Sequence, residues 1–331
     1  MRVLILSHRD VLAALPPEAC AEAMAEVLTE HARGGTYMPL RSVMMPPDAA
    51  GFMGLMPAWR GRHQDRAAAF ALKAICLMPG NPARGLDAHQ GLVTLFDGES
   101  GVPTAILDAS AITAIRTAAV TAVATSLLAR RDARTLAILG AGTQARAHLR
   151  ALANVRGFEH VRVYAPTGAH AQALVQQASL ASAELSVAVS AEEALRDADV
   201  VVTATSAREP VLRHAWLKPG AHLNAVGAST PQAREIDTAT VAASALFCDS
   251  RESLRNEAGE FQLAIREGLI AGEEHVRAEL GEVLAGAAPG RRDDGELTLF
   301  RSLGLAIEDL AAAERAVAAA RARGLGTEVE L

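Results

Sequence analysis

The chain has 331 residues, of which 50% are hydrophobic and 21% charged, and this composition excludes disorder, collagen-like repeats and coiled coil as descriptions of the whole chain. Its 32 basic and 38 acidic residues give a net charge of −6, the wrong sign for a nucleic-acid-binding surface, and only 3% of residues are aromatic. We therefore expect no nucleic-acid partner. The length predicts two domains.

Cysteine usage and the chain start predict a cytoplasmic protein. Cys20, Cys76 and Cys248 lie far apart without CxxC spacing, so neither a metal site nor a disulfide framework is expected. The apolar run at residues 3–6 is too short for a signal peptide, and no stretch reaches the ~20 uninterrupted apolar residues of a membrane helix. No membrane partner is expected.

The first third of the chain predicts a mixed α and β region. A strand at residues 3–6 precedes a helix from Pro17 to about Arg33. Turn residues then bound a series of segments that are typical of one antiparallel sheet. These expected strands are 41–45, 51–56, 67–76, 92–96 and, after the hairpin turn at 97–101, 102–107.

The middle of the chain predicts a parallel sheet. An Ala- and Thr-rich segment, residues 109–131, favours a buried connecting helix. Short apolar runs then alternate with helix-like stretches, which is typical of parallel strands joined by crossover helices. The runs are 136–139, 161–164, 185–189, 200–203, 223–226 and 245–248.

The last segment, 297–323, predicts a strand end and a long Ala-rich helix whose polar face carries Glu308, Asp309 and Glu314. The fold class is thus α/β, with a Rossmann-type doubly wound parallel sheet domain at 121–299. The last helix follows the parallel-sheet region and can pack back on the first domain, so a discontinuous α+β domain is predicted at 1–120 plus 300–331.

A glycine-rich turn follows the first predicted parallel strand. Gly140, Gly142, Thr143, Gln144 and Ala145 give the form G-x-G-x-x-A between a strand and a helix. The first glycine permits the tight turn, the second lets a pyrophosphate approach the backbone, and the small Ala145 lets helix and sheet pack closely. The sequence therefore predicts a dinucleotide site.

The next strand bears on the choice between NAD and NADP. An acid at its end usually holds the ribose 2′-hydroxyl of NAD. Here the strand ends in Ala165-Pro166-Thr167, so no carboxylate repels a 2′-phosphate. Both cofactors stay open, and the neutral end, with Ala165 and Thr167 as candidate contacts, favours NADP.

Three basic residues lie in apolar surroundings: Arg41, Lys73 and Arg116. A buried charge is costly unless it is paired or faces a ligand, and an α-imino acid needs its carboxylate gripped and a proton donor beside its nitrogen. The residues alone leave two readings open: a substrate site, or side chains that extend their charged ends to water.

Several motifs, taken together, resemble the ornithine cyclodeaminase/mu-crystallin family. They occur in the family's order over nearly the whole chain. They are Gly51–Ala58, the Lys73 strand, His89-Gln90-Gly91 with Leu95-Phe96-Asp97, Thr113–Ala119, Gly140–Ala145, Thr203–Ser206 with Glu209-Pro210-Val211, Asn224–Ala228 and Leu299–Asp309.

The resemblance implies that the discontinuous domain, 1–120 plus 300–331, is the substrate-binding and dimerisation domain of a homodimer whose substrate is a small amino or imino acid. Residues that match Arg41 and Arg116 bind the substrate carboxylate in that family, and the one that matches Lys73 lies at the reacting carbon and nitrogen. The resemblance also places Met56 and Ser229 near the substrate. It places the loops with Thr203, Thr205, Val226 and Gly227 along the cofactor.

Two departures decide the expected activity. Cyclodeaminases of the family carry an Asp where this chain has Ser229, and an acidic residue in the stretch that matches residues 53–57. A serine hydroxyl is a far weaker base than a carboxylate, so hydrolytic loss of ammonia lacks its expected catalyst. Both departures resemble the mu-crystallin branch, whose members reduce cyclic ketimines.

The resulting hypothesis is hydride transfer between NAD(P)H and the α carbon of an imino acid, with Lys73 as the catalytic proton carrier. Burial and the two arginines are expected to lower the pKa of Lys73. The alternatives are an ornithine cyclodeaminase, which makes proline and ammonia, and a non-enzymatic, NADP-dependent carboxylate-binding protein. His89 is expected in a turn.

Overall fold

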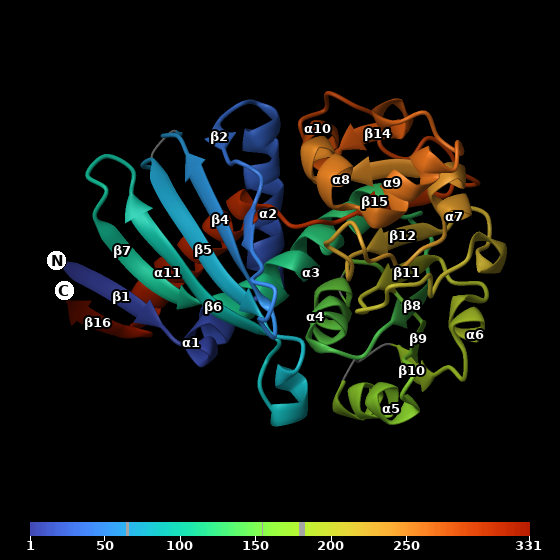
Figure 1. The fold of residues 1–331 in the computed structure, drawn as a ribbon, viewed down its shortest axis with the longest axis horizontal. Helices are drawn as coiled ribbons and strands as arrows, with labels where there is room; N and C mark the ends of the chain where they lie inside the picture. Colours follow the sequence, from blue (N-terminus) through green and yellow to red (C-terminus); the bar gives the residue numbers. More distant parts are fainter. Residues whose placement is uncertain (64–65, 154, 179–182) are drawn as a thin grey trace. The chain divides into compact units, whose positions relative to one another are not determined.

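The computed structural model describes residues 1–63, 66–153, 155–178 and 183–331 (Figure 1). The chain divides into two compact units: unit 1 is Met1–Arg116 with Gly304–Leu331, and unit 2 is Thr117–Leu303. The divisions lie a few residues from the predicted limits at 120 and 300. Each unit has its own eight-stranded sheet, as the predicted α/β class requires.

Unit 1 is an antiparallel sheet with helices against one face. Its sheet has the order β16-β1-β7-β6-β5-β4-β2, with β3 paired to β4 and one parallel pair, β1 with β7. The strands are β1 (Arg2–Leu6), β2 (Thr36–Tyr37), β3 (Ser42–Met44), β4 (Phe52–Arg60), β5 (Ala69–Leu77), β6 (His89–Asp97), β7 (Pro103–Asp108) and β16 (Thr327–Glu330). The helices are α1 (His8–Ala14), α2 (Pro17–Ala32), the 3₁₀ turn η1 (Asn81–Arg84) and α11 (Ala306–Arg323).

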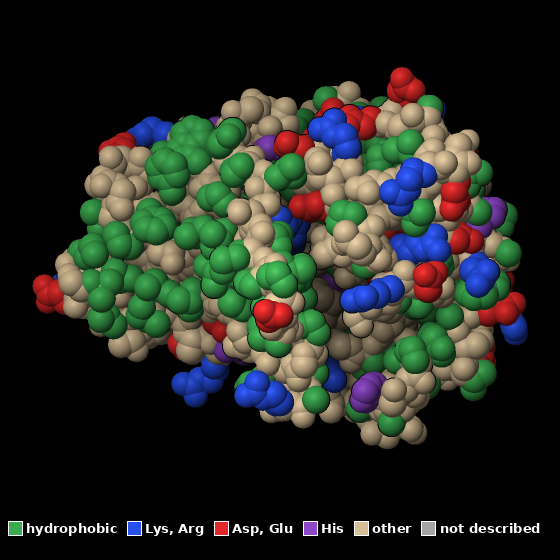
Figure 2. Space-filling view, viewed as in Figure 1, with side chains coloured by type: hydrophobic (Ala, Val, Ile, Leu, Met, Phe, Trp, Pro, Cys, Tyr) green, Lys and Arg blue, Asp and Glu red, His purple; other side chains and the backbone are tan. Residues whose placement is uncertain are grey.

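The two faces of this sheet differ because side chains alternate along each strand. On β5, Ala71, Lys73 and Ile75 are buried on the face that α11 covers, and Figure 1 shows α11 running across that sheet. The intervening Phe70 is 45% exposed. The uncovered face over β4, β5 and β6 is rich in hydrophobic side chains, as Figure 2 shows.

Unit 2 is an all-parallel sheet in the order β10-β9-β8-β11-β12-β15-β13-β14. The strands are β8 (Thr135–Leu139), β9 (His160–Tyr164), β10 (Glu184–Val187), β11 (Val200–Thr203), β12 (His222–Ala225), β13 (Ala245–Cys248), β14 (Val276–Glu279) and β15 (Thr298–Arg301). The helices are α4 (Thr143–Leu152), α5 (Gly168–Gln177), α6 (Ala191–Leu195), α7 (Thr238–Ala243), α8 (Arg251–Glu257), α9 (Gly259–Arg266) and α10 (Leu280–Leu284), with 3₁₀ turns η2 (His214–Trp216) and η3 (Glu273–His275).

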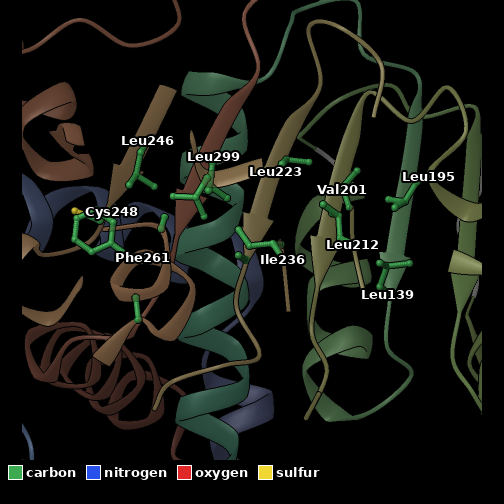
Figure 3. Close-up of a cluster of buried hydrophobic side chains, with 14 of the residues drawn as sticks. Leu139, Leu195, Val201, Leu212, Leu223, Ile236, Leu246, Cys248, Phe261 and Leu299 are labelled. Carbon is green, nitrogen blue, oxygen red and sulfur yellow. The ribbon is translucent and has the colours of Figure 1, made fainter. Parts of the chain in front are cut away.

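The core of unit 2 explains the continuous apolar runs of its strands. All four residues of β11 are buried, because helices cover both faces of a parallel sheet. Figure 3 shows Leu139, Val201 and Leu223 on neighbouring strands within one buried cluster. The sequence missed β14. It also gave no sign that β15 enters the sheet between β12 and β13.

Helix α3 (Ala109–Leu128) joins the two units along the chain and confirms the predicted connecting helix. Among the described residues, it is the one helix long and apolar enough to cross a membrane by length and composition. Most of that segment is buried inside the protein, as expected for a core helix that is apolar on all sides.

An ion-pair network closes one end of the unit 1 core. Arg60, the last residue of β4, is only 2% exposed, and its Nη2 lies 2.5 Å from Oε2 of Glu314 on α11. Its Nε lies 3.8 Å from Oε2 of Glu30 on α2. Burial raises the pKa of Glu314 to about 7, against the pull of the Arg60 charge. The pair therefore ties sheet and helices together at a desolvated position.

We predict that Arg60→Ala lowers the free energy of unfolding by about 3–5 kcal/mol, because it leaves the half-buried carboxylates of Glu30 and Glu314 without their buried cation. The matched control is Arg62→Ala, whose pair with Glu99 is solvent-exposed and is expected to contribute about 0–1 kcal/mol. Urea denaturation at pH 7.5 measures both. Equal losses in the two variants would contradict this account.

Candidate active site

Unit 1 brings the three predicted basic residues to one place. Lys73 lies at the middle of β5, opposite Met56 on β4 and Val93 on β6, and is 2% exposed. Arg116 on α3 is 5% exposed. Arg41, just before β3, donates a 3.0 Å hydrogen bond from Nη2 to the carbonyl of Gly304. The charges of Arg116 and Arg41 both act on Lys73.

Two carboxylates in the first turn of α11 hold this cluster. Asp309 Oδ2 lies 2.7 Å from Lys73 Nζ, and Asp309 Oδ1 lies 3.0 Å from Arg116 Nε. Glu308 Oε2 lies 2.9 Å from Arg116 Nη1. The amino-terminal turn of a helix favours negative charge, so α11 supports both acids electrostatically.

The predicted place of these two acids on a polar helix face is wrong. Glu308 is 0% and Asp309 1% exposed. The reason is the pairing: buried cations need counter-charges, and these two acids supply them. The backbone just before α11 also leaves room for this cluster. Gly304 has φ +80°, and a Cβ there would overlap the Arg116 guanidinium.

The pKa of Lys73 is lowered to about 8, mainly because burial disfavours the ammonium form. The charge of Arg116 and, more weakly, that of Arg41 lower it further. Asp309 raises it and is the second-largest influence, which the sequence did not predict. The balance leaves an amine that gains and loses a proton near neutral pH, as a general acid or base must.

His89 is not in a turn, contrary to the prediction, but is the first residue of β6. Burial and the cationic charges of Lys73 and Arg116 lower its pKa to about 4. The imidazole is therefore neutral at pH 7. It adds no further positive charge to the cluster.

The glycine-rich turn of unit 2 has the expected local structure. Gly140 follows β8 with φ +119°, and a Cβ there would overlap the carbonyl of Ala204. Gly142 is the N-cap of α4, is exposed, and a Cβ there would meet nothing within 4 Å. Thr143 and Gln144 begin the helix, and Ala145 is fully buried against the sheet.

This geometry fits a pyrophosphate. The first amides of α4 lack intrahelical acceptors, and Gly142, which has no side chain, lets a pyrophosphate approach them. The remaining predicted cofactor residues lie at carboxyl ends of neighbouring strands: Ala165 and Thr167 after β9, Thr203 and Thr205 at β11, and Val226 and Gly227 after β12. Ligands of open parallel sheets bind at this edge. Ser229 is exposed two residues beyond Gly227.

A sequence model of the ornithine cyclodeaminase/mu-crystallin family matches residues 1–322. The chain belongs to this family. Ketimine reductase mu-crystallin from Mus musculus is 38% identical over 300 residues, which are 91% of this chain and 90% of the relative.

Solved structures agree over the full length. Thermococcus litoralis Delta(1)-pyrroline-2-carboxylate reductase, in complex with NADH and L-proline, is 36% identical with a TM-score of 0.93, and the match covers 99% of this chain and 100% of that one. An archaeal alanine dehydrogenase dimer with bound NAD is 33% identical with a TM-score of 0.92 and covers both chains completely.

We predict that the Lys73 amine titrates near pH 8. The chain has two lysines, Lys73 and Lys218, so ¹³C-lysine labelling gives two side-chain signals, and Lys218→Met assigns them. Asp309→Asn removes a charge that raises the pKa of Lys73, so its midpoint falls below that of the wild type. A midpoint at or above the ordinary 10.5 would contradict this result.

Proposed function

We propose that this protein is an NAD(P)H-dependent reductase of α-imino acids, with cyclic ketimine carboxylates as the favoured substrate class, and that it catalyses the reverse oxidation of the matching amino acid. The observation that carries the proposal is the buried Lys73 amine, paired with the Asp309 carboxylate that also holds Arg116, with a pKa of about 8. Family membership and the names of the relatives support the same reaction class.

The basic cluster binds and orients the substrate. Arg41 and Arg116 hold the carboxylate through charge-assisted hydrogen bonds, which fixes the neighbouring α carbon and removes much of its orientational freedom. Met56, across from Lys73 on β4, offers an apolar surface for the rest of the ring. This pairing of cations with an apolar strand suits a small hydrophobic imino acid.

Lys73 carries the proton. As an ammonium it donates to the imine nitrogen and makes the α carbon electrophilic, and its lowered pKa makes this proton easy to give up. Asp309 keeps the amine in place during both protonation states. In the reverse direction neutral Lys73 accepts the proton. The bound reduced nicotinamide supplies the hydride for reduction.

Residues Gly140, Gly142, Thr143, Gln144 and Ala145 hold the pyrophosphate in this proposal, and the segments after β9, β11 and β12 hold the two nucleosides. The end of β9 carries no carboxylate, so it accommodates a 2′-phosphate. The solved relatives contain NADH and NAD. We propose that both cofactors are accepted, with NADPH used at least as well as NADH.

Reduction is favoured over cyclodeamination because the chain lacks the acids that hydrolysis needs. Ser229 stands in the place where the resemblance expects a catalytic Asp, and β4 carries Met53 and Met56 rather than an acid. Retained Lys73, with its tuned pKa, speaks against a purely ligand-binding role. The ketimine reduction assay described next distinguishes the reductase from the cyclodeaminase and from the binding protein.

We predict that five- and six-membered cyclic ketimine carboxylates oxidise NADPH or NADH stoichiometrically with this protein. Lys73→Met lowers kcat by roughly 10²-fold or more, because the proton donor is lost, and Lys218→Met serves as the control. Proline and ammonia formed from ornithine with catalytic cofactor would identify a cyclodeaminase instead. Ligand binding without any turnover would instead identify a non-enzymatic carboxylate-binding protein.

The cofactor site gives a second prediction. Gly142→Ala adds a methyl group into open space, so the protein stays folded, while the methyl blocks the approach of the pyrophosphate. We expect roughly tenfold weaker NAD(P)H binding by fluorescence titration with little change in Tm. In the contrasting variant Gly140→Ala the new methyl group clashes with Ala204, so both the NAD(P)H affinity and the Tm fall. Unchanged NAD(P)H affinity in Gly142→Ala would place the cofactor elsewhere.

We further propose a homodimer formed through the uncovered face of the unit 1 sheet. Leu55, Phe70 and Leu92, on β4, β5 and β6, are 37%, 45% and 52% exposed and lie on that face, which Figure 2 shows as largely hydrophobic. Apolar patches of this kind mark protein interfaces, and the archaeal relative is a dimer.

All three cysteines are unpaired, which suits the proposed cytoplasmic location.

We predict that Phe70→Glu converts the dimer to a monomer, because it places a charge in an apolar interface. Light scattering after size-exclusion chromatography measures the mass. Val189→Glu is the control, since Val189 is 88% exposed and belongs to unit 2 rather than to this sheet. A wild-type monomer, or a Phe70→Glu dimer, would contradict the assignment of this face.

A further inference from the structure

Glu235 is a carboxylate that the proposed reaction does not use, and it is only 1% exposed within unit 2. Its Oε1 accepts hydrogen bonds from Thr205, from the backbone N at 2.6 Å and from Oγ1 at 2.8 Å. Its Oε2 accepts from Gly227 N at 2.6 Å, Thr203 Oγ1 at 2.9 Å and Ala228 N at 3.3 Å. One side chain therefore joins two separate chain segments.

These segments are 203–205 and 226–228, which follow the neighbouring strands β11 and β12. They also touch each other and the glycine-rich turn. A Cβ on Gly227 would overlap the backbone of Thr205, and a Cβ on Gly140 would overlap the carbonyl of Ala204. The two segments thus lie in close backbone contact, and Glu235 is their shared hydrogen-bond acceptor.

Arg301 binds the second segment, 226–228, and the end of β12 through their backbone carbonyls. It donates to the carbonyl of Ala225 at 3.0 Å and to that of Ala228, and it pairs with the buried Glu260. The segment after β12 is therefore bound through its carbonyls by Arg301 and through its amides by Glu235. All of these contacts lie within unit 2.

We propose that Glu235 is a positioning residue for the dinucleotide: it fixes segments 203–205 and 226–228 at the spacing that the cofactor requires. This inference rests on the proposed NAD(P)H site. It assigns no proton transfer to Glu235.

The carboxylate is specifically suited to this task. Burial raises the pKa of Glu235, whereas the hydrogen bonds from Thr205 and Thr203 and the charge of Arg301 oppose that shift. Three of its five donors are backbone N–H groups, which cannot reverse their direction. Glutamine has the same shape but turns one acceptor into a donor, so it opposes N–H groups on one side and loosens one segment.

The first experiment measures Glu235→Gln by hydrogen exchange without cofactor. We expect the amides on the side that faces the glutamine NH2, either Thr205 or Gly227 with Ala228, to exchange roughly tenfold faster than in the wild type. The control is Glu209→Gln, whose side chain is 83% exposed and paired with Arg234. Unchanged exchange at these amides in Glu235→Gln would overturn the proposal.

The second experiment measures function in the same variants, with Thr203→Val added as a milder change that removes one hydrogen bond. We expect Glu235→Gln to raise the Kd and KM for NAD(P)H about tenfold or more, with less than a twofold change in the KM for the imino acid. Thr203→Val shifts the same constants in the same direction by a smaller factor. A general folding defect would instead change both KM values.

The outcomes separate the two proposals. Equal NAD(P)H affinity in wild type and Glu235→Gln would overturn the positioning role and leave the cofactor assignment intact. A wild-type protein that binds neither NADH nor NADPH would overturn both.

Discussion

The Asp309 carboxylate, placed between Lys73 Nζ and Arg116 Nε, is the interaction on which the candidate site depends. Two cations buried side by side repel each other and lose their hydration, and neither would remain in this position without a buried counter-charge. Asp309 provides it from the first turn of α11, where the helix dipole favours a negative charge. In the proposed reaction, substrate binding and proton transfer both depend on the resulting geometry.

The same interaction sets a chemical property. Burial alone would hold Lys73 in its neutral form, and a single close carboxylate would by itself hold it charged. The combination of burial, Asp309 and Arg116 leaves a pKa of about 8. This value suits the proposed role of the amine as proton donor in reduction and proton acceptor in oxidation. In unit 2 a second buried acid, Glu235, organises backbone amides rather than cations.

Local patterns predicted much of the fold. The turn residues that bound β5, the apolar runs of β8 and β11, and the glycines at 140 and 142 all depend on near neighbours in sequence. The position of β15 between β12 and β13 depends on long-range pairing that no local pattern records. The cations Lys73 and Arg116 were found because charge in an apolar segment is unusual. Their partner Asp309 was read as a surface acid, since an acid near a helix start is commonplace; the need to neutralise two buried cations was the available signal.

We propose that this charge cluster binds the carboxylate of an imino or amino acid. The decisive measurement is a crystal structure of the protein with NAD(P)H and L-proline. We expect the proline carboxylate within hydrogen-bond distance of Arg41 and Arg116, its nitrogen at Lys73 Nζ, and the Lys73–Asp309 pair retained. A carboxylate bound away from both arginines, or Lys73 turned away from the ligand, would contradict it.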